Sequence, residues 1–185
     1  MHTTCYNLTM INIQDWRAPI AEMYIEKQKL AAVDSAGIFP MFQPALAASE
    51  TAIEALEKAL NIQLNDEHRS FLTYADGWNC FYQNVTLFST DELASGSLRD
   101  AAYQAFEHTP EVLEDLGLST ENLLPIAASL EQADVFVMLV ENGVVKPEVL
   151  WIAEGEVIDK YQTFGEYFMS MIEYTKRRTA KIQGA

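Results

Sequence analysis

The chain has 185 residues, of which 49% are hydrophobic and 21% charged, and its formal net charge at pH 7 is −15. This length suits one principal hydrophobic core, and this composition excludes a disordered chain, a collagen-like repeat and a disulfide scaffold. The longest apolar run, residues 135–140, is the size of a strand and far shorter than the roughly 20 residues of a membrane-spanning helix.

The N-terminal segment lacks the features of a secretory signal. Residues 1–16 contain no lysine or arginine and no sustained apolar stretch, so we expect a cytoplasmic protein. The only cysteines, Cys5 and Cys80, are then expected to be reduced thiols, although the sequence does not decide whether they pair. Weak alternation of apolar and polar residues over 1–14 is compatible with an edge strand.

A helix and an irregular linker are expected next. Apolar side chains recur at helical spacing over residues 18–33, which predicts a helix. Residues 34–48 contain a glycine and two prolines and are expected to be irregular. Phe39, Met41 and Phe42 of this linker are expected to pack down on the core.

Two short helices are predicted after the linker. Thr51 and Glu54 have the spacing of a capping box, which predicts a helix start. A second helix is expected over residues 65–75, with Phe71 inward. Asp76-Gly77 should end it, because aspartate and glycine tolerate the left-handed conformation of a helix stop.

The remainder of the chain predicts an α+β domain. We expect strands at residues 85–88, 123–127, 134–140 and 144–153, and helices at residues 98–108 and 110–116. Asn142-Gly143 predicts a tight hairpin turn, and Pro147 indicates a bulge or an edge position in the strand that follows. Thr163 and Glu166 have capping-box spacing and should open a closing helix. Helices, then strands, then a covering helix favour a mixed or antiparallel sheet packed against N-terminal and C-terminal helices.

The negative charge is concentrated in the middle of the chain. Residues 1–49 carry a net −1, residues 50–175 hold 23 acidic and five basic side chains for a net −18, and residues 176–185 carry +4. Such a surface repels nucleic acid and anionic membranes and attracts basic partners by long-range steering. We therefore expect a protein partner, with no nucleic acid and no membrane; the alternative is that the acidity serves solubility alone.

The inventory of catalytic motifs is thin. The sequence has no phosphate-binding loop, no metal-binding His or Cys spacing and no nucleophile elbow, so no metal, cofactor or catalytic residue is predicted. His68 lies beside Asp66 and Glu67, and a carboxylate near an imidazole could tune a general base, but neighbouring helix residues do not face each other. We expect His68 to be a surface histidine, and a hydrolase that uses a carboxylate pair or His68 is the least favoured function.

Two segments carry a resemblance to a known family. Residues 64–78 and 87–93 resemble the signature of the SUKH superfamily, the Smi/Knr-type domains found as bacterial immunity proteins and as a fungal cell-wall regulator. The positions that carry the likeness, together with a tryptophan of a later strand, are Leu64, Phe71, Leu72, Asp76, Gly77, Trp78, Leu87, Phe88 and Trp151. Asn65, His68 and Asp76 depart from the usual proline, aromatic and asparagine. The likeness covers residues 50–178, with an N-terminal extension at 1–49 and a basic tail at 179–185.

The resemblance implies a non-catalytic binding domain that neutralises a cognate bacterial toxin, here a basic one such as a nuclease. The expected contact residues are exposed acids with an aromatic anchor, namely Trp78, Tyr82, Asp91, Glu92, Glu111, Glu114, Asp115 and Glu121. The alternative is a regulatory scaffold or oligomeric adaptor, in which residues 1–49 mediate self-association into a homo-oligomer.

Overall fold

The computed structural model describes residues 13–129 and 134–184. Within these ranges, six strands form one sheet in the order β1-β2-β3-β4-β5-β6, and each strand is antiparallel to the next. The strands are β1 (Trp78–Tyr82), β2 (Val85–Leu87), β3 (Leu123–Ala128), β4 (Val135–Glu141), β5 (Val144–Ala153) and β6 (Glu156–Tyr161). The predicted α+β fold is confirmed, with a wholly antiparallel sheet.

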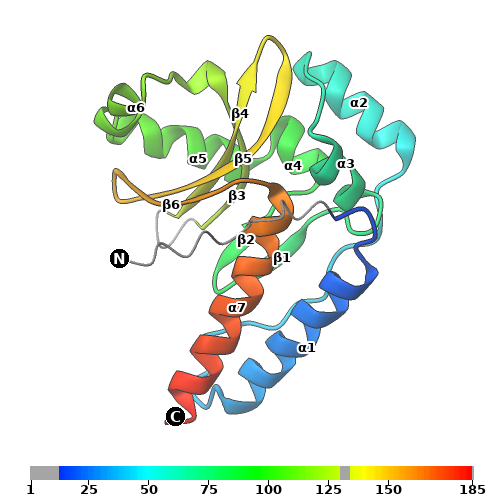
Figure 1. Cartoon of the computed structure of the whole chain (residues 1–185), viewed down its shortest axis with the longest axis vertical. Helices are drawn as coiled ribbons and strands as arrows, with labels where there is room; N and C mark the ends of the chain where they lie inside the picture. The colour runs from blue at the N-terminus through cyan, green and yellow to red at the C-terminus, as the bar shows by residue number, and fades with distance from the viewer. Residues whose placement is uncertain (1–12, 130–133, 185) are drawn as a thin grey trace, which may run out of the picture.

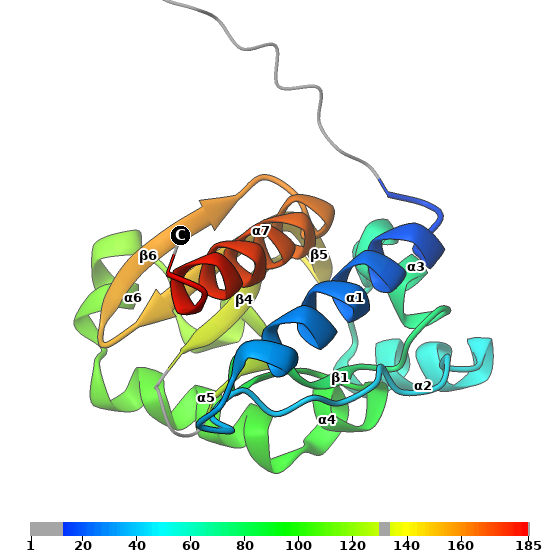
Figure 2. The same cartoon turned by 90° about the horizontal axis from the view of Figure 1, so that it is seen from below.

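Helices cover both faces of this sheet (Figures 1 and 2). They are α1 (Arg17–Val33), α2 (Glu50–Leu60), α3 (Asp66–Leu72), α4 (Thr90–Ser95), α5 (Ser97–His108), α6 (Glu111–Leu116) and α7 (Phe164–Ile182), with a short 3-10 turn η1 (Thr120–Asn122). Helix α7 lies on one face with α1 beside it. Helices α4, α5 and α6 lie on the other face (Figure 2).

The core is centred on the inward face of α7. The predicted closing helix is present, and its inward face consists of the buried residues Phe164, Phe168, Met171, Ile172 and Thr175. Aromatic rings from segments far away in the sequence contact Phe168 of α7. The ring centroid of Trp16 lies 5.2 Å from that of Phe168, and the ring centroid of Phe81 lies 4.8 Å from it. Residues before and after the sheet therefore share one hydrophobic core.

The predicted hairpin and bulge are both present. Asn142 and Gly143 join β4 to β5 with φ values of 52° and 75°, as a tight turn requires. The register of the β4–β5 pair shifts between Met138 and Val140, opposite the segment that contains Pro147. A missing amide hydrogen is tolerated there because the ladder is interrupted.

Three local predictions were wrong. Helix α2 begins at Glu50, and its cap is Ser49, whose side chain accepts a hydrogen bond from the amide of Ala52; the Thr51 capping box is not used. Helix α3 ends at Leu72, before the predicted Asp76-Gly77 stop. In the linker Phe39 and Met41 are half-buried as expected, but Phe42 is 46% exposed. The predicted edge strand at 1–14 and Cys5 lie largely or wholly outside the described residues.

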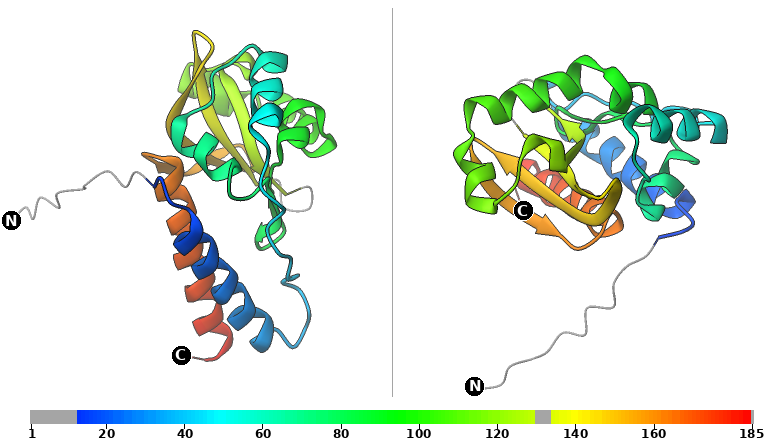
Figure 3. Two further views of the ribbon diagram at one scale, coloured as in Figure 1. Left: turned by 90° about the vertical axis from the view of Figure 1, so that its right-hand side faces the viewer. Right: turned by 90° about the horizontal axis from the view of Figure 1, so that it is seen from above.

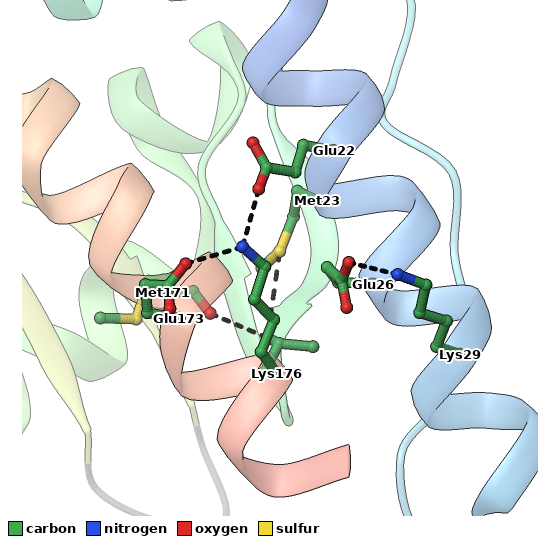
Figure 4. A network of polar contacts seen from close by, with 8 residues as sticks. Glu22, Met23, Glu26, Lys29, Met171, Glu173 and Lys176 are labelled. Carbon is green, nitrogen blue, oxygen red and sulfur yellow. Dashed lines mark hydrogen bonds and ion pairs between the residues drawn. The ribbon is translucent and has the colours of Figure 1, made fainter. Parts of the chain in front are cut away.

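Helices α1 and α7 project together from the sheet, with the C-terminus near their far end (Figure 3, left). Lys176 of α7 joins them, because its Nζ lies 2.8 Å from a carboxylate oxygen of Glu22 and 2.7 Å from one of Glu173 (Figure 4). Next to the half-buried Lys176–Glu22 ion pair, the hydroxyl of buried Thr175 lies 3.9 Å from the sulfur of Met23.

Candidate partner-binding surface

The signature residues Asp76, Gly77 and Trp78 fix the meeting point of β1, α4 and the linker. The Asp76 carboxylate accepts hydrogen bonds from the amide of Thr90 at 2.6 Å and from its hydroxyl at 3.0 Å. Gly77 has a φ of +82°, and a Cβ there would lie 2.6 Å from the amide nitrogen of Ser89. The Trp78 indole donates to the carbonyl of Phe42 at 2.8 Å. These signature residues therefore have structural roles.

The helix that carries Glu67 and His68 is held by similar contacts. Asn65 caps α3, and its side-chain oxygen accepts hydrogen bonds from the amides of Glu67 at 3.0 Å and His68 at 3.4 Å. Glu67 is buried, and its two carboxylate oxygens accept from the amides of Ile13 at 2.5 Å and Gly165 at 2.8 Å. The carboxylate thus joins α3 to the first turn of α7.

The prediction that His68 lies on the surface was wrong. Its side chain is fully buried, with the ring centroid 4.7 Å from that of Phe164. Neither ring nitrogen has a hydrogen-bond partner among the described residues. Burial lowers the pKa of His68 to about 4. Because Asp66 is exposed whereas Glu67 and His68 are buried, the three do not converge on a solvent-accessible site.

The two aromatic residues predicted to anchor a partner lie in the core. Trp78 is 1% exposed and Tyr82 is 7% exposed, so neither offers its ring to a partner in this conformation. Both belong to β1, an edge strand of the sheet, which contacts α7 through Phe81 and α1 through the Cys80 carbonyl that accepts from Lys27. Tyr82 instead contacts Trp151 and Tyr174 at centroid distances of 6.2 and 6.0 Å.

The predicted acidic contact residues are separated into two groups. Asp91 is exposed on α4, but the carboxylate of Glu92 accepts hydrogen bonds from the amides of Leu98 at 2.6 Å and Arg99 at 3.0 Å and so caps α5. The other four, Glu111, Glu114, Asp115 and Glu121, are exposed on α6 and η1. Helix α5 separates α4 from α6 (Figure 1).

Helix α6 and the β5–β6 turn lie at the same end of the sheet (Figure 1), and both carry exposed acidic residues. Helix α6 buries Val112 and Leu113 and thereby directs its acids outward. The turn lies against the end of α5, since a Cβ at Gly155 would be 3.2 Å from the Thr109 methyl carbon. We define the acidic face by its exposed residues Glu107, Glu111, Glu114, Asp115, Glu154 and Glu156. None of these six forms an ion pair with a described residue.

Sequence reasoning missed half of the acidic face. Glu107, Glu154 and Glu156 were not among the predicted contact residues. Glu154 and Glu156 were missed because the strand β6 and its turn were not predicted, whereas Glu107 lies at the end of the predicted helix α5. One signal was available in the sequence, namely that residues 100–145 contain no lysine or arginine.

No helix in the described part of the chain is long and apolar enough to cross a membrane. Among the same residues, no group of three or more His, Cys, Asp or Glu side chains is placed to hold a metal ion.

A sequence model of the SMI1 / KNR4 family (SUKH-1) matches residues 47–170. The match begins near the end of the linker and stops within α7, so it contains the whole sheet and the acidic face. Helix α1 and the last part of α7 lie outside it. No curated protein matches the chain. The resemblance drawn from residues 64–78 and 87–93 is confirmed.

Proposed function

We propose that this chain, which belongs to the SMI1 / KNR4 family (SUKH-1), is a non-catalytic immunity-type protein. In this proposal it binds and neutralises a cognate bacterial toxin that has a basic surface. The observation that supports this proposal is the acidic face on α6 and the β5–β6 turn. Its six exposed carboxylates form no ion pair with a described residue, so they are available to cations supplied by a partner.

The charge of the acidic face also defines the chemistry of the partner. Clustered carboxylates raise the rate of encounter with a basic protein, and steered association rates reach about 10⁸ M⁻¹s⁻¹ at low salt. A nuclease carries lysine and arginine side chains for the phosphates of its substrate. Covering those cations with the acidic face would block the nuclease without any reaction catalysed by this chain.

A pull-down from the native cell tests the proposal. The full tagged chain is the bait, and bound proteins are eluted at rising salt and identified by mass spectrometry. We compare the wild type with E111Q/E114Q/D115N, which removes three charges of the acidic face. The matched control, E54Q/D66N/E148Q, removes the same number of charges from exposed residues elsewhere.

The wild type and the control should retain one basic partner that is released as salt rises. The acidic-face variant should recover about tenfold less of it and release it at lower salt, because the attraction depends on the local charge. Equal binding by the two triple variants would show that the acidic face is not part of the interface with the partner. Recovery of only copies of the chain, or of many cytosolic proteins, would favour the scaffold or adaptor alternative.

A further inference from the structure

An apolar groove lies on the far side of α1 from α7. The groove has a volume of about 510 Å³. It is lined by residues of α1, of the linker and of the segment that follows α3, namely Arg17, Ile20, Ala21, Tyr24, Gln43, Pro44 and Tyr74. Gln43 spans its rim, since its side-chain nitrogen lies 3.4 Å from the Tyr24 hydroxyl. Helix α1 therefore has apolar side chains on two sides. Met23 and Leu30 are buried, whereas Ile20 and Tyr24 in the groove are only half-buried and Ala21 is exposed.

A protruding leucine follows two residues after Pro44, which lines this groove. Leu46 is 92% exposed, the largest exposed fraction among the large apolar side chains of the described residues. Its backbone is nevertheless fixed, because its carbonyl accepts a hydrogen bond from the Asp76 amide at 3.1 Å, and the neighbouring Ala45 amide donates to Gly77 at 3.1 Å. A rigid backbone thus presents an apolar knob two residues from Pro44, which lines the groove.

The charge of this surface suits a second copy of the chain. Two molecules that each carry −15 repel one another over most of their surfaces. Residues 17–48, which supply most of the groove and the knob, hold three basic and three acidic side chains and are neutral overall. Two copies can therefore approach through this surface with less repulsion than through the acidic residues 50–175.

We infer that Leu46 of one copy inserts into the groove of a second copy, and that the chain forms a symmetric dimer. A knob and a groove on the same surface are self-complementary, so a twofold axis makes both contacts at once and leaves neither groove open. The dimer uses no residue of the acidic face. It is therefore independent of the proposed toxin binding, and each can fail without the other.

Sedimentation velocity and light scattering of the full chain over a wide concentration range test the inference. The wild type should reach a mass twice that of the 20.8 kDa chain. L46E should weaken dimerisation about 100-fold or more, because two buried leucines are lost from each dimer. A21W, which fills the groove and leaves the knob intact, should weaken it as well. Point variants are used because truncation of the first 48 residues would remove Trp16 and Met23 from the core.

Ile158→Glu is the matched control, since Ile158 is 49% exposed on β6 and the change introduces the same charge. The control should dimerise like the wild type. A wild type that stays at 20.8 kDa at every concentration would overturn the inference and leave the groove to a different occupant. A dimer that persists in L46E or A21W, or that is lost in I158E, would also overturn it by placing the contact elsewhere.

Discussion

The carboxylate of Glu67 accepts a hydrogen bond from the amide of Gly165 at 2.8 Å, across 98 residues of sequence. The same carboxylate accepts from the amide of Ile13, so one buried side chain ties the entry to α1, helix α3 and the start of α7. A negative charge at the first turn of a long helix is favourable because it faces the positive end of the helix dipole. This contact explains why α7 closes over the core at that point.

Removing the contact between Glu67 and Gly165 should lower the free energy of unfolding, and a double-mutant cycle can measure the coupling between the two residues. E67A should lower the free energy of unfolding by about 2–4 kcal/mol, because the buried amide of Gly165 and the part-buried amide of Ile13 lose their acceptor. G165A should lower it by about 1–3 kcal/mol through overpacking, since its Cβ would lie 2.4 Å from a Glu67 oxygen. In E67A/G165A the clash with the Glu67 carboxylate is absent. The loss of unfolding free energy, measured by urea denaturation, should therefore be smaller than the sum of the two single losses. Additive losses would contradict the direct contact.

Gly77 should tolerate substitution far less than another glycine with a similar backbone. G77A forces a Cβ to within 2.8 Å of the Leu87 carbonyl oxygen, so the free energy of unfolding should fall by about 3 kcal/mol or more. Gly117 has a φ of +66° and no atom within 4 Å of its Cβ position. G117A should therefore cost only about 1 kcal/mol. Similar urea midpoints for the two variants would argue against the close approach.

Buried His68 should make the fold acid-sensitive. Its pKa is lowered by burial from 6.5 to about 4. Between these pH values the unfolded chain binds a proton that the folded chain does not, so stability falls as the pH drops from 6.5 toward 4. The loss attributable to this residue is about 3 kcal/mol. H68F should abolish that part of the slope in urea titrations at successive pH values. An identical pH dependence in wild type and H68F would show that His68 does not contribute.

Lys27 should give a stability change at alkaline pH. Its Nζ donates to the Cys80 carbonyl, and burial lowers the pKa of its ammonium from 10.5 to about 8. As the pH rises from 8 to 10.5, the unfolded chain retains a proton that the folded chain has lost, so stability should rise through this window. The difference between wild type and K27M, followed by urea unfolding, should vary with pH there. A constant difference would mean that Lys27 stays charged in the folded chain.

The sequence predicted the elements whose signals are local. The start of α7 at Thr163 and the Asn142-Gly143 turn each depend on residues within a few positions of one another, and both are present. The strand β6 was missed because Glu156–Tyr161 combines charged and apolar residues, and its place at the sheet edge follows from pairing with β5.

The errors at the candidate site have a different cause. His68 follows two acids on a short helix, a pattern typical of a surface, but the ring of Phe164 covers it from far along the chain. Trp78 is covered in the same way, by the linker that carries Phe42. The acids of α6 were predicted from charge alone, whereas Glu154 and Glu156 joined them only once the β5–β6 turn was placed beside α5.

The most direct test of the immunity proposal is the growth of host cells that produce the captured basic partner. Co-production of the wild-type chain or of E54Q/D66N/E148Q should restore growth, and E111Q/E114Q/D115N should restore it less at equal protein levels. A partner that does not arrest growth, or an arrest that the wild-type chain leaves unchanged, would contradict the proposed neutralisation of a toxin.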